Sequence, residues 1–215
     1  SSSSPARVAR IPLARQPLQS PLCQPRRQPS GPPARTNLET TRRASGKASS
    51  SMASSDGASQ LKAKDITAEN FAPFGQVIAP TDDGKHFDES DAQLVLSGGV
   101  PRFYIMRLPR RGLSFKTIVH HAIVTQCLGS TQAEPWYMAV AAKDVETPSA
   151  DNMHAFRIPP GVYIKLHCGT WHAGPLFDSA DHLDFANLEL SDTNVTDFNC
   201  FDFLGTPTEE YHILP

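Results

Sequence analysis

Residues 161–176 read GVYIKLHCGTWHAGPL, a stretch in which apolar and polar side chains alternate before a turn that contains glycine. Successive side chains of a strand point to opposite faces, so Lys165 and His167 should share one face while Ile164 and Leu166 share the other. The pattern predicts a half-buried strand that places a cation and an imidazole on one wall of a β fold.

A second imidazole and an indole follow the same turn. Gly169 can fold the chain back and bring His172 close to His167, and Trp171 should be mostly buried beside them. A cation and two imidazoles on one wall suit an anionic substrate whose reaction needs proton transfer, so we predict a functional site here. The alternative is that Trp171 belongs to the core and the histidines are hydrogen-bonded structural residues.

Basic residues are unevenly distributed along the chain. Residues 1–51 hold nine of the 20 Lys and Arg side chains but only one of the 22 acidic ones, so a basic leader precedes an acidic body. The leader lacks aromatic residues and apolar runs, and we expect residues 1–59 to be disordered.

The Ser- and Arg-rich composition of the leader predicts a chloroplast transit peptide, whereas translation from Met52 would leave a cytoplasmic protein. Because no aromatic side chain is present for base stacking, we expect no nucleic-acid partner.

Residues 60–215 have the size of one compact domain. No apolar stretch is long enough to span a membrane.

Thr67 is the expected N-cap of a short helix over 68–74, which Gly75 would end. Short β-branched and aromatic runs then alternate with Gly- and Pro-containing turns, which favours a sandwich or barrel. We expect strands at 76–79, 93–97, 102–107, 115–127 (two strands or one bent strand), 136–142, 153–158, 162–167, 183–190 and 199–203.

Several segments, taken in order, resemble the ureidoglycolate lyase family, formerly called ureidoglycolate hydrolases. FAPFGQVI at 71–78 is similar to the family's opening F-x-x-(Y/F)-G-x-V-I, and LGSTQA at 128–133 is similar to its L-G-(T/S)-Q-A turn. Residues 162–176 resemble its G-V-x-(Y/x)-H-x-x-x-W-H-H-P-L signature. The resemblance covers most of residues 61–203. It implies a mainly β, cupin-like double-stranded β-barrel of the jelly-roll type with one or two short helices, and a homodimer.

The chain departs from the family pattern at several positions, among them one extra residue in LGSTQA and an extra Gly174. Residues 124–127 read VTQC where the family usually has (E/x)-R-H-P, and Ala173 stands in place of the second of two adjacent histidines. The resemblance implies cleavage of ureidoglycolate to glyoxylate and urea in allantoin and purine breakdown. A non-catalytic barrel that binds a small carboxylate is the alternative, and it would explain Gln126 and Ala173 directly.

The family reaction needs a base, an acid at the departing nitrogen and a cation for the carboxylate. We assign His172 as the base and His167 as its partner or acid, because imidazole suits both tasks near neutral pH. Lys165 is assigned to the carboxylate, with Arg107 as the alternative. Three further residues are expected to bind or orient the substrate: His121, Gln132 and Trp171.

Cupin barrels often hold a metal through an H-x-H motif, a following Glu and a later His. Here His120 and His121 are adjacent and should point to opposite faces of a strand, and Glu134 follows too late in the chain for that motif. A site built from His121, His172 and either Gln132 or Glu134 stays open, as does a metal-dependent oxygenase. We nevertheless predict an enzyme that needs no cofactor.

Overall fold

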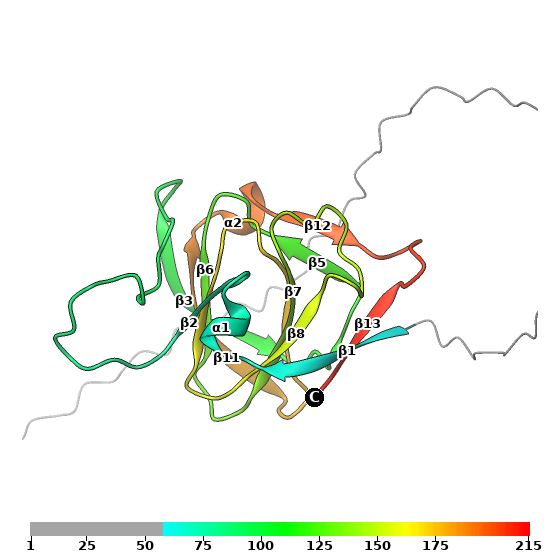
Figure 1. The fold of residues 1–215 in the computed structure, drawn as a ribbon, viewed down its shortest axis with the longest axis horizontal. Helices are drawn as coiled ribbons and strands as arrows, with labels where there is room; N and C mark the ends of the chain where they lie inside the picture. Colours follow the sequence, from blue (N-terminus) through cyan, green and yellow to red (C-terminus); the bar gives the residue numbers. More distant parts are fainter. Residues whose placement is uncertain (1–57) are drawn as a thin grey trace, which may run out of the picture.

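The computed structural model describes residues 58–215 (Figure 1). The leader predicted over 1–59 lies outside the described residues except for its last two positions, which begin the first strand. In chain order the described elements are β1 (Ala58–Asp65), α1 (Ala68–Phe71), β2 (Gly75–Ile78), β3 (Pro101–Pro109), β4 (Ser114–Phe115), β5 (Thr117–His120), β6 (Gln126–Ser130), β7 (Trp136–Ala141), β8 (His154–Ile158), β9 (Tyr163–Leu166), β10 (Trp171–Leu176), β11 (His182–Leu190), α2 (Thr193–Thr196), β12 (Asn199–Asp202) and β13 (Glu210–Leu214).

The strands form two curled sheets that face each other (Figure 1). The larger has the order β12-β5-β10-β7-β8-β1-β13-β4, and the smaller has the order β2-β9-β6-β11-β3. In the smaller sheet β11 pairs antiparallel with β3 along its whole length and with β6 on its other side. The prediction of a mainly β fold with barrel-like sheets and two short helices is confirmed.

The helix α1 begins where the sequence predicted. Thr67 is its N-cap, with the side-chain oxygen accepting from the Asn70 N–H while the Asn70 side chain accepts from the Thr67 N–H. This reciprocal pair satisfies two donors at the start of the helix. The helix ends at Phe71, earlier than expected, because the Phe74 N–H bonds to the Phe71 carbonyl in a turn that leads directly into β2.

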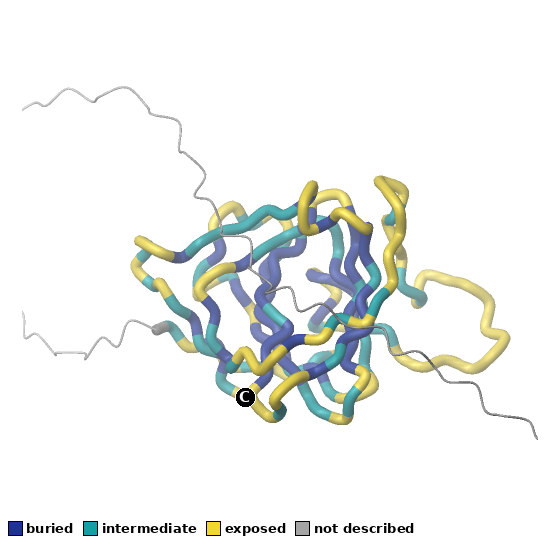
Figure 2. Tube along the Cα trace, turned by 180° about the vertical axis from the view of Figure 1, so that it is seen from behind, coloured by how far each residue is buried: buried dark blue, intermediate teal, exposed yellow. Residues whose placement is uncertain are grey.

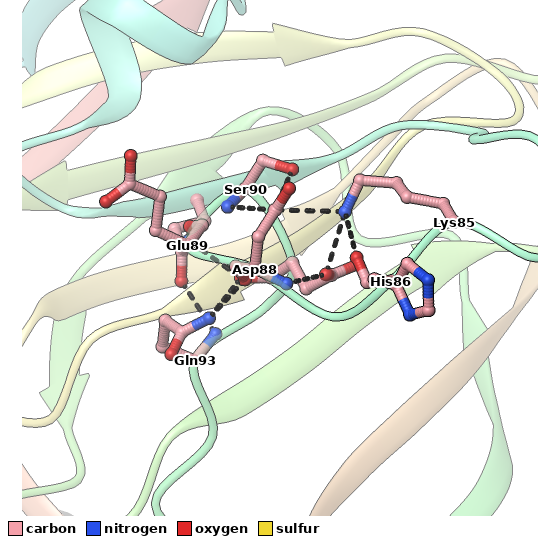
Figure 3. A network of polar contacts seen from close by, with 8 residues as sticks. Lys85, His86, Asp88, Glu89, Ser90 and Gln93 are labelled. Atoms are coloured by element: carbon pink, nitrogen blue, oxygen red, sulfur yellow. Dashed lines mark hydrogen bonds and ion pairs between the residues drawn. The ribbon is translucent and has the colours of Figure 1, made fainter.

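The long connection between β2 and β3 contains no strand, so the strand predicted at 93–97 is wrong. Its backbone groups do not join a sheet: Gln93 N–H bonds to Gln76 Oε1, Val95 N–H bonds to Thr125 Oγ1, and the Val95 oxygen accepts from the Thr125 N–H. Lys85 closes the loop through ion pairs of 2.9 Å with Asp88 and with Asp91 (Figure 3). Hydrogen bonds from Ser90 and then from Lys85 lower the pKa of Asp88 to about 2.

Two apolar cores lie on the two faces of the larger sheet. The central strand β7 is buried on both faces: Tyr137 and Ala139 belong to one core, and Met138 and Val140 belong to the other. The second core occupies one part of the space between the sheets, where β7 faces the inward side chains of β9. Figure 2 shows this distribution, with buried segments along the central strands and exposed segments in the connections. The interior between the sheets is therefore the place where a shielded site can form.

Candidate active site

A cavity of about 850 Å³ opens between the two sheets. The larger sheet contributes residues of β5 and β10 to its wall, and the smaller sheet contributes residues of β3, β6 and β11. The polar side chains on which its chemistry depends are Tyr104, Arg111, His121, Gln126, His172 and Asn187. A concave site with a few polar groups among apolar ones is typical of a small-molecule site.

His121 and His172 meet in the wall of this cavity. His172 pairs with Val119 across β10 and β5, and His121 lies two positions beyond Val119, on the same face. The two ring centroids are 5.3 Å apart, and the residues are 4% and 5% exposed. Their chain neighbours point the other way, with the rings of His120 and Trp171 4.2 Å apart. The prediction that the adjacent histidines occupy opposite faces is confirmed.

Main-chain carbonyls hold both cavity imidazoles. His172 Nδ1 lies 3.1 Å from the Thr170 oxygen, and His121 Nδ1 lies 2.8 Å from the Asp197 oxygen. A carbonyl oxygen only accepts, so each Nδ1 carries a proton, and the neutral His172 ring keeps its lone pair on Nε2. Burial, and then the neighbouring His121, lower the pKa of His172 to about 3. The His172 ring is therefore neutral at physiological pH.

Three arginines border the cavity, and they differ in what they already bind. The Nε and Nη2 atoms of Arg107 each lie 2.7 Å from the Asp184 carboxylate, so this guanidinium is occupied. Arg102 stacks over the Tyr104 ring, 3.7 Å from its centre. Arg111 has no ion pair or hydrogen bond within residues 58–215, and burial lowers its pKa. Among these three, Arg111 is the cation available to a carboxylate.

A buried chain of hydrogen bonds links β6, β11 and β3. Gln126 Nε2 lies 2.8 Å from Glu189 Oε2, the Tyr104 hydroxyl lies 3.1 Å from Glu189 Oε1, and Asn187 Nδ2 lies 3.0 Å from the Tyr104 oxygen. Sequence reasoning missed Glu189, Asn187 and Tyr104. The signal was present in β11, where Asn187 and Glu189 share the inward face with Phe185 and so place polar groups at core positions.

Lys165 and His167 lie outside the cavity. As predicted, they share a face, and Lys165 Nζ and His167 Nδ1 are 2.8 Å apart. Ile164 and Leu166 fill the core between the sheets, so Lys165 projects from the opposite face of the smaller sheet. The prediction that His167 and His172 share one cavity is wrong, because the turn between β9 and β10 carries the chain from one sheet to the other.

Trp171 and Gln132 also lie away from the cavity wall. Trp171 is 9% exposed, packs in the core behind β10, and donates its indole N–H to the Val145 oxygen at 2.9 Å. Its predicted burial is confirmed. Gln132 accepts from the Asp184 N–H at 2.6 Å and so fixes the turn after β6 against β11.

No group of three or more His, Cys, Asp or Glu residues within 58–215 is arranged to hold a metal ion. His121 and His172 form a pair, and Glu134 is not part of the cavity wall. Independence from a metal stays a prediction.

The neutral imidazole of His172 beside His121, a guanidinium with no partner among residues 58–215 and fixed amides, enclosed between curled β-sheets, define a small-molecule site in a barrel-like β fold. The sequence model of the ureidoglycolate lyase family matches residues 58–208, and the chain belongs to this family. It is thereby placed among the lyases that cleave ureidoglycolate in purine catabolism. A search of curated proteins found no match. No helix in the described residues is long and apolar enough to cross a membrane.

Proposed function

We propose that the cavity beside His121 and His172 is the place where ureidoglycolate is cleaved to glyoxylate and urea. The observation that carries this proposal is the imidazole pair whose Nδ1 atoms are both engaged by main-chain carbonyls. This arrangement leaves Nε2 of each ring for the ligand. A neutral imidazole is in the protonation state that a general base needs.

The reaction requires one proton to move within the site. His172 Nε2 removes the proton of the carbinol hydroxyl, the carbon–oxygen bond becomes a carbonyl, and the carbon–nitrogen bond breaks with its electron pair on the urea nitrogen. The imidazolium then returns the proton to that nitrogen, so glyoxylate and urea leave with no net proton uptake. The single hydroxyl proton goes to His172, so His121 Nε2, an acceptor in the tautomer that the Asp197 oxygen fixes, receives a hydrogen bond from an N–H of the ureido group. The carboxylate of the bound substrate favours the imidazolium and so raises the pKa of His172 during turnover.

Arg111 holds the substrate carboxylate in this proposal. It borders the cavity without a partner among residues 58–215, whereas Arg107 is already paired with Asp184. The sequence-based roles of Lys165 and His167 would require both side chains to reach the cavity from the far face of β9. We therefore replace Lys165 with Arg111 as the carboxylate ligand, and His167 with His121 as the second imidazole.

A steady-state assay of glyoxylate release from ureidoglycolate, run with and without EDTA, tests the proposal. Equal release of glyoxylate and urea, unchanged by the chelator, is the expected result. Release of ammonia would indicate a hydrolase, and loss of activity in EDTA would indicate a metal enzyme. Binding of glycolate without any turnover would favour the non-catalytic carboxylate-binding protein.

The proposed assembly is a homodimer that forms through β3. This strand is an edge of the smaller sheet, and its outward side chains Phe103 and Ile105 are 69% and 54% exposed. An exposed apolar edge strand is a ready template for pairing with a second chain. A second copy would cover both side chains.

The cellular location is proposed on the sequence alone. Import into chloroplasts is expected if residues 1–51 act as a transit peptide, and a cytoplasmic protein is expected if translation starts at Met52. An import assay with the full chain, compared with a chain that starts at Met52, separates the two.

A further inference from the structure

Two buried amide oxygens at the cavity have no hydrogen-bond partner in the described part of the chain. They are Gln126 Oε1 and Asn187 Oδ1. Both residues line the cavity, and they are 8% and 1% exposed. An acceptor that is removed from water and left unbonded costs free energy, and most buried acceptors in folded proteins have a partner. Two such acceptors in one cavity wall indicate that the missing donors belong to a ligand.

The orientation of both amides follows from one carboxylate. Glu189 can only accept, so the Gln126 end that faces it must be the NH₂ group, which turns Oε1 away. The Tyr104 hydroxyl gives its single proton to the other oxygen of Glu189, so its own oxygen must accept from Asn187 Nδ2. Asn187 Oδ1 is therefore also the amide atom that points away from this chain of hydrogen bonds.

The neighbouring strands bring these two oxygens to one region. Asn187 lies opposite Leu128 in the register of β11 and β6, and Gln126 is two residues from Leu128 on the same inward face. Gln126 and Asn187 are thus diagonal neighbours on the sheet, within reach of one small ligand. The two unbonded acceptors therefore lie in one part of the cavity wall.

We propose that Gln126 Oε1 and Asn187 Oδ1 accept hydrogen bonds from the N–H groups of the ureido end of the substrate. This inference rests on the proposed function of the cavity. The ureido group carries three N–H donors, whereas the carboxylate end of ureidoglycolate has acceptors alone. Two fixed acceptors bind the ureido end and repel the carboxylate, so they set the direction in which the substrate lies. Glu189 and Tyr104 act as positioning residues.

The same arrangement sets specificity. A 2-hydroxy acid without a ureido group would leave both amide oxygens buried and unbonded, and a site built to bind polar groups strongly rejects an analogue that lacks them. The departure from the family pattern at Gln126 therefore has a function in this chain. It supplies one of the two acceptors.

The test compares two competitive inhibitors, each of which carries one end of the substrate. Urea has the ureido donors without the carboxylate, and glycolate has the carboxylate without the donors. Inhibition of glyoxylate release by each is measured for the parent, Gln126→Met, Asn187→Leu and Arg111→Met. Gln60→Met, an exposed glutamine on β1, is the matched control.

Gln126→Met and Asn187→Leu should each weaken inhibition by urea about 3- to 10-fold, the effect of one hydrogen bond, and leave inhibition by glycolate unchanged. Arg111→Met should weaken inhibition by glycolate and leave inhibition by urea unchanged. Unchanged inhibition by urea in both amide variants would overturn the inference while leaving the proposed function intact. If one of the two amide variants does not fold, inhibition of the other by urea still tests the inference. A parent protein that does not cleave ureidoglycolate would overturn the proposed function, and direct binding of urea by calorimetry would then test the two oxygens separately.

Discussion

The imidazoles of His121 and His172 lie with their ring centroids 5.3 Å apart, the first directly after the end of β5 and the second inside β10. The pairing of these strands sets the contact, because His172 lies opposite Val119. The same register sends the adjacent rings of His120 and Trp171 to the other face of the sheet. This one strand pairing therefore places Trp171 in the core and the imidazoles of His121 and His172 in the cavity wall.

Stability should fall as the pH drops from 6.5 toward 3. The pKa of His172 is lowered to about 3 in the fold, while in the unfolded chain it returns to its ordinary value near 6.5. Between these values the unfolded chain binds more protons, so the contribution of His172 is present above pH 6.5 and is lost as the pH falls. Within this range the free energy of unfolding changes by up to about 1.4 kcal/mol per pH unit.

Urea denaturation at several pH values measures this slope. The variant His172→Asn, which keeps a donor for the Thr170 oxygen, should reduce the pH dependence of the free energy of unfolding. The matched variant His86→Asn, at an exposed position, should not. A parent protein equally stable at pH 7 and pH 4.5 would contradict a buried neutral His172.

Trp171→Ala should lower the free energy of unfolding by about 3–5 kcal/mol, because the indole is buried in the core and its loss leaves a cavity. Trp171→Phe should cost less, since it mainly removes the hydrogen bond to the Val145 oxygen. Guanidinium titration monitored by circular dichroism gives both values. A fully stable alanine variant with altered ligand binding would instead make Trp171 a cover of the site.

Arg111→Met should raise KM for ureidoglycolate about 10- to 100-fold, because it removes a charged hydrogen-bond partner of the carboxylate. Lys165→Met should leave KM close to that of the parent, since its side chain projects from the far face of β9. Steady-state kinetics with both variants separate the structure-based assignment from the sequence-based one. A large rise in KM for Lys165→Met alone would restore Lys165 as the carboxylate ligand.

Phe103→Glu should convert the proposed dimer into a monomer, because it places a charge on the exposed face of an edge strand. Phe87→Glu serves as the control, since Phe87 is also exposed but lies in the connection between β2 and β3. Analytical ultracentrifugation gives the masses. A parent that is monomeric, or a dimer that survives Phe103→Glu, would rule out this interface.

Much of the fold was predictable from local patterns. Thr67 marked the start of α1, and alternation marked strands such as β9 and β11, because each has one face in a core. The strands β1, β10 and β13 were missed. β1 reads ASQLKAKD, and its polar residues conceal a strand that is stabilised by parallel pairing with β8 and β13 rather than by its own pattern.

The site was predictable only in part. Alternation correctly placed Lys165 beside His167, and the family resemblance pointed to His121 and His172. Local sequence could not show that the turn after His167 crosses between sheets, which separates it from His172. Nor could spacing reveal that Gln126 and Glu189, far apart in the chain, bond at 2.8 Å, because strand register alone brings them together.

Turnover of ureidoglycolate by His172→Asn decides whether His172 is the base of the reaction. Asparagine preserves the donor to the Thr170 oxygen but has no counterpart of Nε2, so the fold should persist while the proposed base is absent. We predict a kcat lower by about 10²–10⁴-fold, with circular dichroism like that of the parent and unchanged inhibition by urea. A folded His172→Asn protein that turns over ureidoglycolate at the parent rate would contradict it.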